Sequence, residues 1–239
     1  MIWFGKSDIG LKRNVNEDAF ILKPEVGFCS VADGIGGASA GEVASRIFIE
    51  SACEMFLSLR EQSEGGVVEA IKKTFWSANE KIRNCKKENP HYKGMGCTAE
   101  LMAWFNYRIT LGHVGDSRAY LYRAGDLRQI TRDHTFIQDQ VDKKLINPSE
   151  AKKHPLRNVI LRAVGEKDSL EVDVIRGMSK PDDIYLLCSD GLTEMVDDTV
   201  IKDVLSLSLS LSKKIEILIE LANKAGGNDN ITVLLGQAG

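Results

Sequence analysis

The chain contains no long apolar run, no cluster of basic residues and no linker rich in serine, glycine or proline. A bilayer-spanning helix needs about 18 or more consecutive apolar residues, so the sequence predicts no membrane span. The N-terminus also lacks the apolar stretch of a signal peptide. Basic and acidic residues are nearly balanced, 31 against 34, which argues against nucleic acid or an anionic membrane as the main partner.

Close cysteine pairs are also missing. The five cysteines are scattered, and no two of them have C-x-x-C spacing. Zinc sites and dithiol redox centres use such pairs, so neither is expected. No C-x₅-R phosphate-binding loop is present either, which excludes that form of cysteine chemistry on phosphate esters. We expect reduced thiols and a cytoplasmic location.

The 239 residues show no repeat and no internal boundary, so we expect one domain over 1–239. Strand-like segments do not alternate regularly with helical ones, which favours an α+β fold of antiparallel sheets with paired helices. Helices are predicted at 37–59 and 66–88, separated by "EGG". Residues 98–131 predict a four-stranded meander with turns at Asn106, "GDS" and "AGD".

Acidic residues recur where predicted strands begin or end. They are Glu17, Asp18, Asp33 (in "DGIGG", 33–37), Asp116, Asp190 and Asp229. Strand ends of stacked sheets can meet along one rim, where unpaired carboxylates repel one another unless cations neutralise them. Hard divalent ions such as Mg²⁺ and Mn²⁺ prefer oxygen ligands. Gly34 would let a backbone carbonyl approach such an ion, so the pattern indicates a metal site.

Each motif also has a simpler interpretation. "GDS" alone is typical of a hairpin turn, "NDN" of a turn or cap, and "SDGLTE" of a helix start. Four acids at strand exits, three of them in D-G or G-D pairs, favour the metal site over isolated turns.

Eight motifs resemble those of one known family, in the family's order and across nearly the whole chain. They are "RNVNEDA" (13–19), "VADGIGGASAGEVAS" (31–45), "GCTAE" (96–100), "GHVGDSRAYLYR" (112–123), "LRQITRDHT" (127–135), "HPLRNVILRAVG" (154–165), "LLCSDGLTEMV" (186–196) and "GGNDNITVLL" (226–235). The chain resembles the metal-dependent serine/threonine protein phosphatases of the 2C type, also called the PPM family, in their bacterial branch.

The resemblance implies an αββα sandwich of two antiparallel sheets flanked by helix pairs, with a flap at about 132–162. It also implies hydrolysis of phosphoserine and phosphothreonine by in-line attack of a hydroxide that bridges two Mn²⁺ or Mg²⁺ ions. By motif, Asp33 would bridge both ions, and Asp190 and Asp229 would complete the ligands of the first. Glu17 and the backbone oxygen of Gly34 would serve the second ion.

The remaining site residues are also assigned by the resemblance. Asp18 would hold water molecules around the ions, and Asp116 with Asp190 would form a weaker third metal site. Arg13 would bind the substrate phosphate and, with Asp33, act in catalysis. Ile35 stands where eukaryotic relatives have a histidine, so the sequence names no proton donor for the leaving group.

The expected partners are phosphorylated proteins and the pathway of a cognate bacterial serine/threonine kinase, with the phosphatase acting as a monomer. Two other functions stay open. One is a phosphoprotein-binding module with little or no turnover, which the intact Asp33, Asp190 and Asp229 argue against. The other is a small-molecule phosphatase with the same metal centre.

Overall fold

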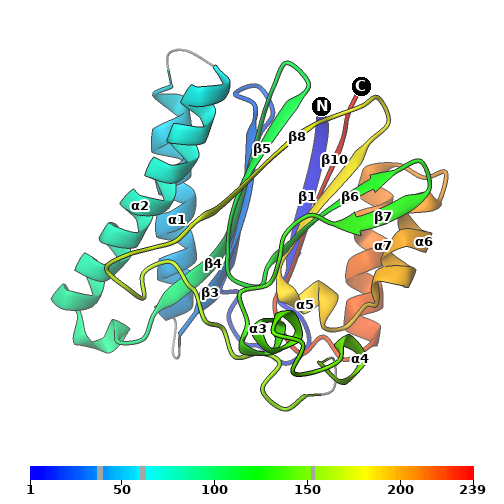
Figure 1. Ribbon diagram of the computed structural model, residues 1–239. Helices are drawn as coiled ribbons and strands as arrows, with labels where there is room; N and C mark the ends of the chain where they lie inside the picture. The colour runs from blue at the N-terminus through cyan, green and yellow to red at the C-terminus, as the bar shows by residue number, and fades with distance from the viewer. Residues whose placement is uncertain (37–39, 60–62, 152–153) are drawn as a thin grey trace.

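The computed structural model describes residues 1–36, 40–59, 63–151 and 154–239. Two five-stranded antiparallel sheets lie face to face, and helices cover the outer face of each (Figure 1). This arrangement confirms the predicted α+β fold and its αββα layering. The last glycine of "DGIGG", Gly37, and the first three residues of the helix expected at 37–59 lie outside the described residues.

Sheet A joins the two ends of the chain. Its strands, in spatial order, are β1 (Ile2–Asp8), β10 (Ile231–Gln237), β9 (Ile184–Cys188), β6 (Arg118–Arg123) and β7 (Asp126–Gln129). β1 and β10 pair along their full lengths, so the chain that leaves β1 at Asp8 starts next to the chain that enters β10 at Ile231. The pairing brings the loop that carries Arg13 and Glu17 close to Asp229.

Sheet B carries the aspartate of "DGIGG". Its strands, in spatial order, are β2 (Asp18–Lys23), β3 (Phe28–Ile35), β4 (Gly96–Phe105), β5 (Arg108–Val114) and β8 (Asp173–Met178). β3 does not stop before Asp33 but continues through Asp33 and Gly34 to Ile35. Pairing with β2 and β4 on both sides keeps these residues extended, and Asp33 lies directly opposite Asp18.

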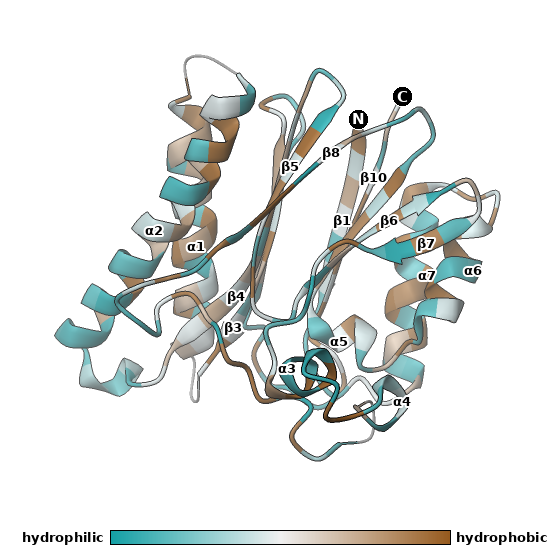
Figure 2. Cartoon of the chain, viewed as in Figure 1, coloured by the Kyte–Doolittle hydropathy of each residue, from teal (hydrophilic) through white to brown (hydrophobic). Residues whose placement is uncertain are grey.

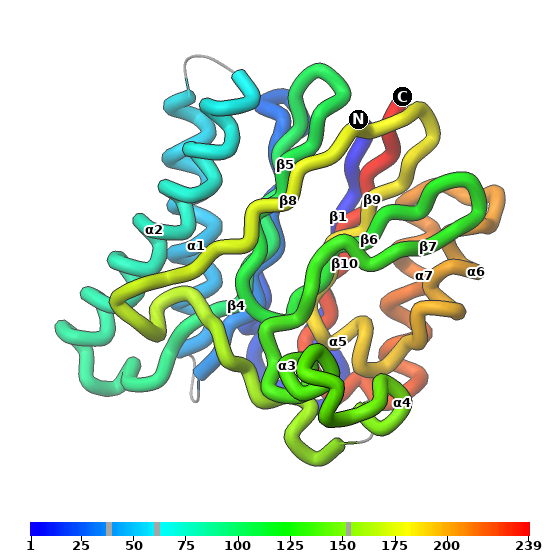
Figure 3. The backbone as a smooth tube through the Cα atoms, viewed as in Figure 1, coloured from blue at the N-terminus to red at the C-terminus, as the bar shows by residue number. Residues whose placement is uncertain are grey.

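The predicted four-stranded meander is wrong in one respect. The hairpins β4–β5 and β6–β7 form as expected. β5 and β6, however, belong to different sheets, so "GDS" is a crossover between the sheets and not a hairpin turn (Figure 3). Alternating apolar residues predict strands but do not specify their partners. As a result, Asp116 lies where the chain passes from sheet B to sheet A.

Two long helices, α1 (Ala40–Leu57) and α2 (Glu64–Glu88), cover sheet B, and α6 (Asp198–Ser206) and α7 (Leu211–Lys224) cover sheet A (Figure 1). The prediction that "EGG" separates the first two helices is wrong, because these residues form the first turn of α2. The Ser63 hydroxyl accepts a hydrogen bond from the Gly66 N–H at 3.1 Å. This N-cap stabilises a helix start that two glycines would otherwise disfavour.

The short helices lie at one end of the sandwich, opposite the N- and C-termini (Figure 1). They are α3 (Phe136–Asp142), α4 (Pro148–Ala151) and α5 (Asp190–Thr193), while a 3₁₀ turn, η1 (Pro90–Tyr92), follows α2. Among the described residues, no helix combines the length and the apolar character needed to cross a bilayer.

The core has three apolar layers, one between the sheets and one beneath each helix pair. Figure 2 colours the chain by hydropathy and shows apolar residues on the strands and on the long helices. In the central layer the Trp3 and Trp104 rings stack with centroids 5.2 Å apart, which joins sheet A to sheet B. Trp76, by contrast, lies on α2 and is 58% exposed.

Replacing Trp3 with alanine should lower the free energy of unfolding by about 3–5 kcal/mol, because it leaves a cavity between the sheets. Urea denaturation measures the change. Phe4→Ala on the same strand is the matched control, since Phe4 is 45% exposed and Trp3 only 6%. The control should cost about 1 kcal/mol or less. Equal losses from the two substitutions would contradict the described inter-sheet core.

Candidate active site

Asp18 and Asp33 face each other across β2 and β3. One oxygen of Asp18, Oδ2, accepts hydrogen bonds from the Ser189 hydroxyl at 2.7 Å and the Thr232 hydroxyl at 2.6 Å. Because both donors belong to the sheet A side, these bonds join the two sheets at the rim. The other oxygen, Oδ1, is buried without a hydrogen-bond partner.

Glu17 and Gly34 lie against the start of α1. The Gly34 N–H donates to the Glu17 carbonyl at 3.2 Å, and the Glu17 carboxylate accepts from the Gly41 N–H, also at 3.2 Å. A Cβ atom at Gly34 would lie 2.3 Å from the Gly41 carbonyl oxygen and 2.6 Å from that of Glu17. Only glycine fits at this position, so the "DG" pair reflects a close approach of three backbone segments.

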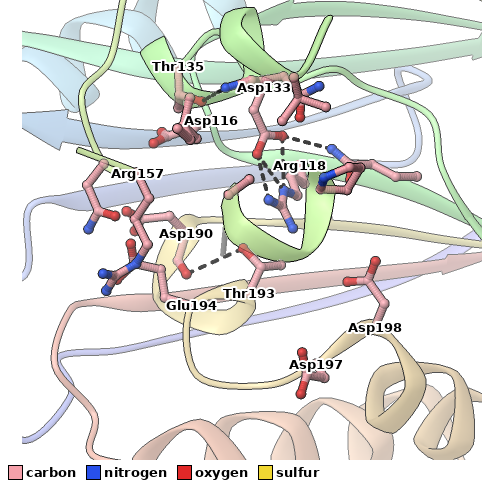
Figure 4. Close-up of a pocket in the computed structure, with 17 residues that line it drawn as sticks. Asp116, Arg118, Asp133, Thr135, Arg157, Asp190, Thr193, Glu194, Asp197 and Asp198 are labelled. Carbon is pink, nitrogen blue, oxygen red and sulfur yellow. Dashed lines mark hydrogen bonds and ion pairs between the residues drawn. The ribbon is translucent and has the colours of Figure 1, made fainter. Parts of the chain in front are cut away.

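Asp116 and Asp190 line one cavity of about 450 Å³ at the end of the sandwich (Figure 4). Asp190 is the first residue of α5, and Asp116, which is 8% exposed, lies on the crossover. In each residue Oδ1 is buried and has no hydrogen-bond partner. Among the described residues, four further carboxylates and two arginines line the cavity: Asp133, Glu194, Asp197, Asp198, Arg118 and Arg157.

Arg13 pairs with the carboxylates of Asp229 and Glu17. Its guanidinium lies 2.7 Å from the Asp229 carboxylate and 3.6 Å from that of Glu17. The arginine side chain is 44% exposed, so one face of the guanidinium stays accessible to solvent. The second oxygen of Asp229 accepts from the Asn230 N–H at 2.8 Å.

Electrostatic repulsion links the carboxylates. Burial, and then the charges of Asp18 and Asp190, raise the pKa of Asp33 well above its ordinary value. Burial and the charges of Asp116 and Asp229 do the same to the pKa of Asp190. Burial also raises the pKa of Asp18 to about 6 and that of Asp116 to about 7. Carboxylates this close to one another hold protons unless a cation replaces them.

The donor set fits hard divalent cations. Three buried carboxylate oxygens, one each from Asp18, Asp116 and Asp190, lack any partner, and a buried unpaired carboxylate is costly without a counter-charge. Among the described residues, no three His, Cys, Asp or Glu side chains form a group that holds an ion in their present arrangement. Asp229 is engaged by Arg13 instead.

Asn230 is a site residue that the sequence interpretation missed, because only Asp229 of its motif was assigned a role. Its Oδ1 accepts from the Glu17 N–H at 2.8 Å, and its amide donates to the carbonyls of Ile9 and Val15 at 2.9 and 3.1 Å. These bonds fix the loop that carries Arg13 and Glu17 to the start of β10. The only available signal was the position of Asn230 beside Asp229 in "GGNDN".

The αββα sandwich and its carboxylate-lined rim are the architecture expected of a 2C-type phosphatase, and comparison with known proteins agrees. Residues 8–140 match the family described as Protein phosphatase 2C. The serine/threonine phosphatase stp of Listeria welshimeri is 35% identical over 234 residues, which cover 96% of this chain and 93% of that protein. The chain belongs to the protein phosphatase 2C family.

The serine/threonine protein phosphatase PstP of Mycobacterium tuberculosis is 36% identical over 97% of this chain. The match spans 44% of the length of PstP. The crystal structure of M. tuberculosis PstP/Ppp superposes with a TM-score of 0.92 at 36% identity, covering 99% of this chain and 97% of that one. The PstP catalytic domain in complex with two manganese ions gives a TM-score of 0.89 at 34% identity, covering 99% and 97%.

The raised carboxylate pKa values predict an unusual pH dependence of stability. Asp18 and Asp116 bind protons more tightly when folded, with pKa values of about 6 and 7 against an ordinary 3.8. Their contribution is therefore greatest at low pH and is lost as the pH rises through about 6 and 7. The melting temperature of chelator-treated protein should fall between about pH 5 and pH 8, and Asp116→Asn should reduce that fall. A melting temperature that rises over this range, unchanged by the substitution, would contradict the described repulsion.

Proposed function

We propose that the chain is a protein serine/threonine phosphatase that depends on Mn²⁺ or Mg²⁺. The observation that carries the proposal is the group of mutually repelling carboxylates around Asp33, with unpartnered oxygens on Asp18, Asp116 and Asp190. The family match and the manganese complex of the similar PstP catalytic domain support it.

In this proposal Asp33, Asp190 and Asp229 would hold the first ion, and Asp33, Glu17 and the carbonyl of Gly34 would hold the second. The hydrogen bond from the Gly41 N–H to Glu17 fixes the orientation of that carboxylate. Asp18 is held by two hydroxyl groups, and its unpartnered oxygen would hold water molecules around the ions.

Asp116 has a separate proposed role, in which it and Asp190 hold a weaker third ion. Both line the cavity, and Glu194, which is four residues after Asp190, lines it too. Burial, the first cause, and the charge of Asp229 raise the pKa of Glu194, although Arg157 lowers it. A cation in this cavity would offset charge that two arginines do not neutralise.

The bound ions would supply Lewis acidity and an activated water for in-line attack on phosphorus. The protein provides binding and orientation. Arg13, anchored by Asp229, points its planar guanidinium across the opening, where it can bind two phosphate oxygens. Buried Glu17 and Asp116 keep the ligand oxygens in fixed positions. No cysteine is proposed to take part, because Cys29, Cys97 and Cys188 are buried and Cys53 and Cys85 lie on α1 and α2, which cover sheet B.

The substrate is proposed to be a protein rather than a small metabolite. The segment 132–162, which we propose as the flap of a single catalytic domain over 1–239, exposes apolar side chains beside the cavity. Leu145 is 68% exposed, Leu156 46% and Val159 42%. Apolar groups at the edge of a polar site suit a polypeptide that continues past the phosphorylated residue.

We also propose that the opposing enzyme is a bacterial serine/threonine kinase, and that the phosphatase works as a cytoplasmic monomer without nucleic-acid or membrane partners. The similar proteins PstP of M. tuberculosis and stp of L. welshimeri are serine/threonine phosphatases by name, which supports the kinase class. The near balance of charge supports the absence of a nucleic-acid partner.

Asp33→Asn should reduce hydrolysis of a phosphothreonine peptide with Mn²⁺ by about a thousandfold or more, because both ions lose their shared ligand. EDTA should abolish the wild-type activity. Phosphate release measures the rate, and calorimetry counts the ions bound. Asp203→Asn, an exposed aspartate on α6, is the matched control and should leave both quantities unchanged.

Three outcomes would contradict the proposal in different ways. Full turnover in EDTA would remove the metal-dependent mechanism. A folded wild type that binds Mn²⁺ and the phosphopeptide without releasing phosphate would favour the binding-module alternative. Turnover of small phosphate esters with no preference for phosphopeptides would favour the small-molecule alternative.

Arg13→Lys should lower kcat/KM for a phosphopeptide by about tenfold or more, since an ammonium group cannot bind two phosphate oxygens with a planar fork. Arg13→Ala should lower it further. Steady-state kinetics at saturating Mn²⁺ measure the loss, and Lys12→Ala, at the exposed neighbouring position, is the control. An Arg13→Lys variant with unchanged kcat/KM would exclude the bidentate role of Arg13.

A further inference from the structure

His134 holds the crossover that carries Asp116. Its backbone N–H donates to the Gly115 carbonyl at 2.7 Å, and its ring Nδ1 accepts from the Gly115 N–H at 3.1 Å. One residue thus satisfies both backbone groups of Gly115. His134 is 8% exposed, so water does not compete freely for these bonds.

Gly115 has little freedom to adjust. Its φ is +113°, a conformation that side chains disfavour, and a Cβ atom would lie 2.4 Å from the Thr98 Cβ. On the other side of Asp116, the Ser117 and Thr98 hydroxyls are hydrogen-bonded at 2.6 Å. Asp116 is therefore fixed by the residue before it and the residue after it. Its own buried Oδ1 contributes no bond to this arrangement.

The far side of the His134 ring is also held. Nε2 lies 3.3 Å from the Asp173 carboxylate, which also pairs with the Arg162 guanidinium at 3.1 Å. Burial, with the nearby charges of His113 and Arg162, lowers the pKa of His134 to about 4, so the ring is neutral near pH 7. Since Nδ1 accepts from Gly115, the single ring proton belongs on Nε2, facing Asp173.

A second histidine supports the first. The His113 and His134 rings lie 4.5 Å apart between centroids. His113 is fully buried, its Nδ1 is hydrogen-bonded to Glu100, and its Nε2 lies 2.8 Å from the Arg132 carbonyl. His113 is therefore a hydrogen-bonded core histidine. The two rings connect sheet B to the start of the flap segment 132–162.

His134 also helps to join the two ends of the flap segment, residues 134–136 and 159–161, which we call its neck. The Leu161 N–H donates to the His134 carbonyl at 2.7 Å, and the Phe136 N–H donates to the Val159 carbonyl at 2.7 Å. Thr135 and Ile160 form a bridge between these two bonds. His134 therefore contacts the crossover through its ring and N–H. Its carbonyl contacts the other side of the neck, at Leu161.

We propose that His134 is a positioning residue that fastens the Gly115–Asp116 turn to the neck of the flap and so orients the Asp116 carboxylate into the cavity. The proposal rests on the metal-binding role proposed for Asp116. In this role the ring orders the weaker cation site, in addition to packing inside the fold.

Two substitutions test whether the His134 ring holds the Gly115–Asp116 turn. His134→Leu keeps an apolar side chain but removes the acceptor for the Gly115 N–H. His134→Asn retains an acceptor, because its Oδ1 is as many bonds from Cα as the histidine Nδ1. Amide hydrogen exchange of Gly115, followed by NMR on the chelator-treated protein, should speed up about tenfold in the leucine variant and recover in the asparagine variant. This readout needs neither metal nor activity.

Mn²⁺ titration by calorimetry then tests whether the loss of this hydrogen bond weakens cation binding at Asp116. The leucine variant should bind the weakest Mn²⁺ about tenfold less tightly and leave the two tighter ions unchanged, with partial recovery in the asparagine variant. His91→Leu, in the exposed turn η1, is the control. Unchanged Gly115 exchange, or equal weakening of all ions, would overturn the proposal.

Failure of this inference is distinguishable from failure of the proposed function. A wild type that binds only two ions would overturn the link between His134 and a third cation, while hydrolysis of the phosphothreonine peptide would continue to support the phosphatase. If the wild type has no phosphatase activity, the proposed function fails. The Gly115 exchange rate would still show whether His134 holds the Gly115–Asp116 turn.

Discussion

Mutual repulsion among buried carboxylates is the constraint on which the rim of this sandwich depends. Asp33 lies among Asp18, Asp116, Asp190 and Asp229, and each of these charges raises its pKa. Proteins rarely keep such an arrangement for stability alone, because unpaired buried charge is destabilising. A divalent cation converts the repulsion into attraction, so the same geometry that weakens the metal-free fold favours ion binding.

The fold holds the carboxylates in place through backbone contacts more than through ion pairs. Gly34 packs against two carbonyl oxygens, Asn230 fixes the loop before β2, and His134 holds both polar groups of Gly115. Asp18 is bonded to hydroxyls from the opposite sheet. Each anchor restricts a carboxylate that would otherwise turn toward solvent, so the repulsion is maintained by the packing of both sheets.

Local sequence patterns predicted most of the strands and the long helices, because apolar periodicity reflects burial. They failed where the outcome depends on distant residues. "GDS" has the composition of a hairpin turn, and only the pairing of β5 and β6 with different partners makes it a crossover. The acids were recognisable from their motifs, whereas Asn230 and His134 act through backbone groups that no local pattern identifies.

Anomalous diffraction from crystals grown with Mn²⁺ tests the central claim most directly, because it locates the ions without reference to activity. The account predicts two strong peaks that share the Asp33 carboxylate, with Asp190 and Asp229 at the first. Peaks that lie away from Asp33, or a fully loaded crystal in which Arg13 still pairs with Asp229 and no ion contacts either aspartate, would contradict it.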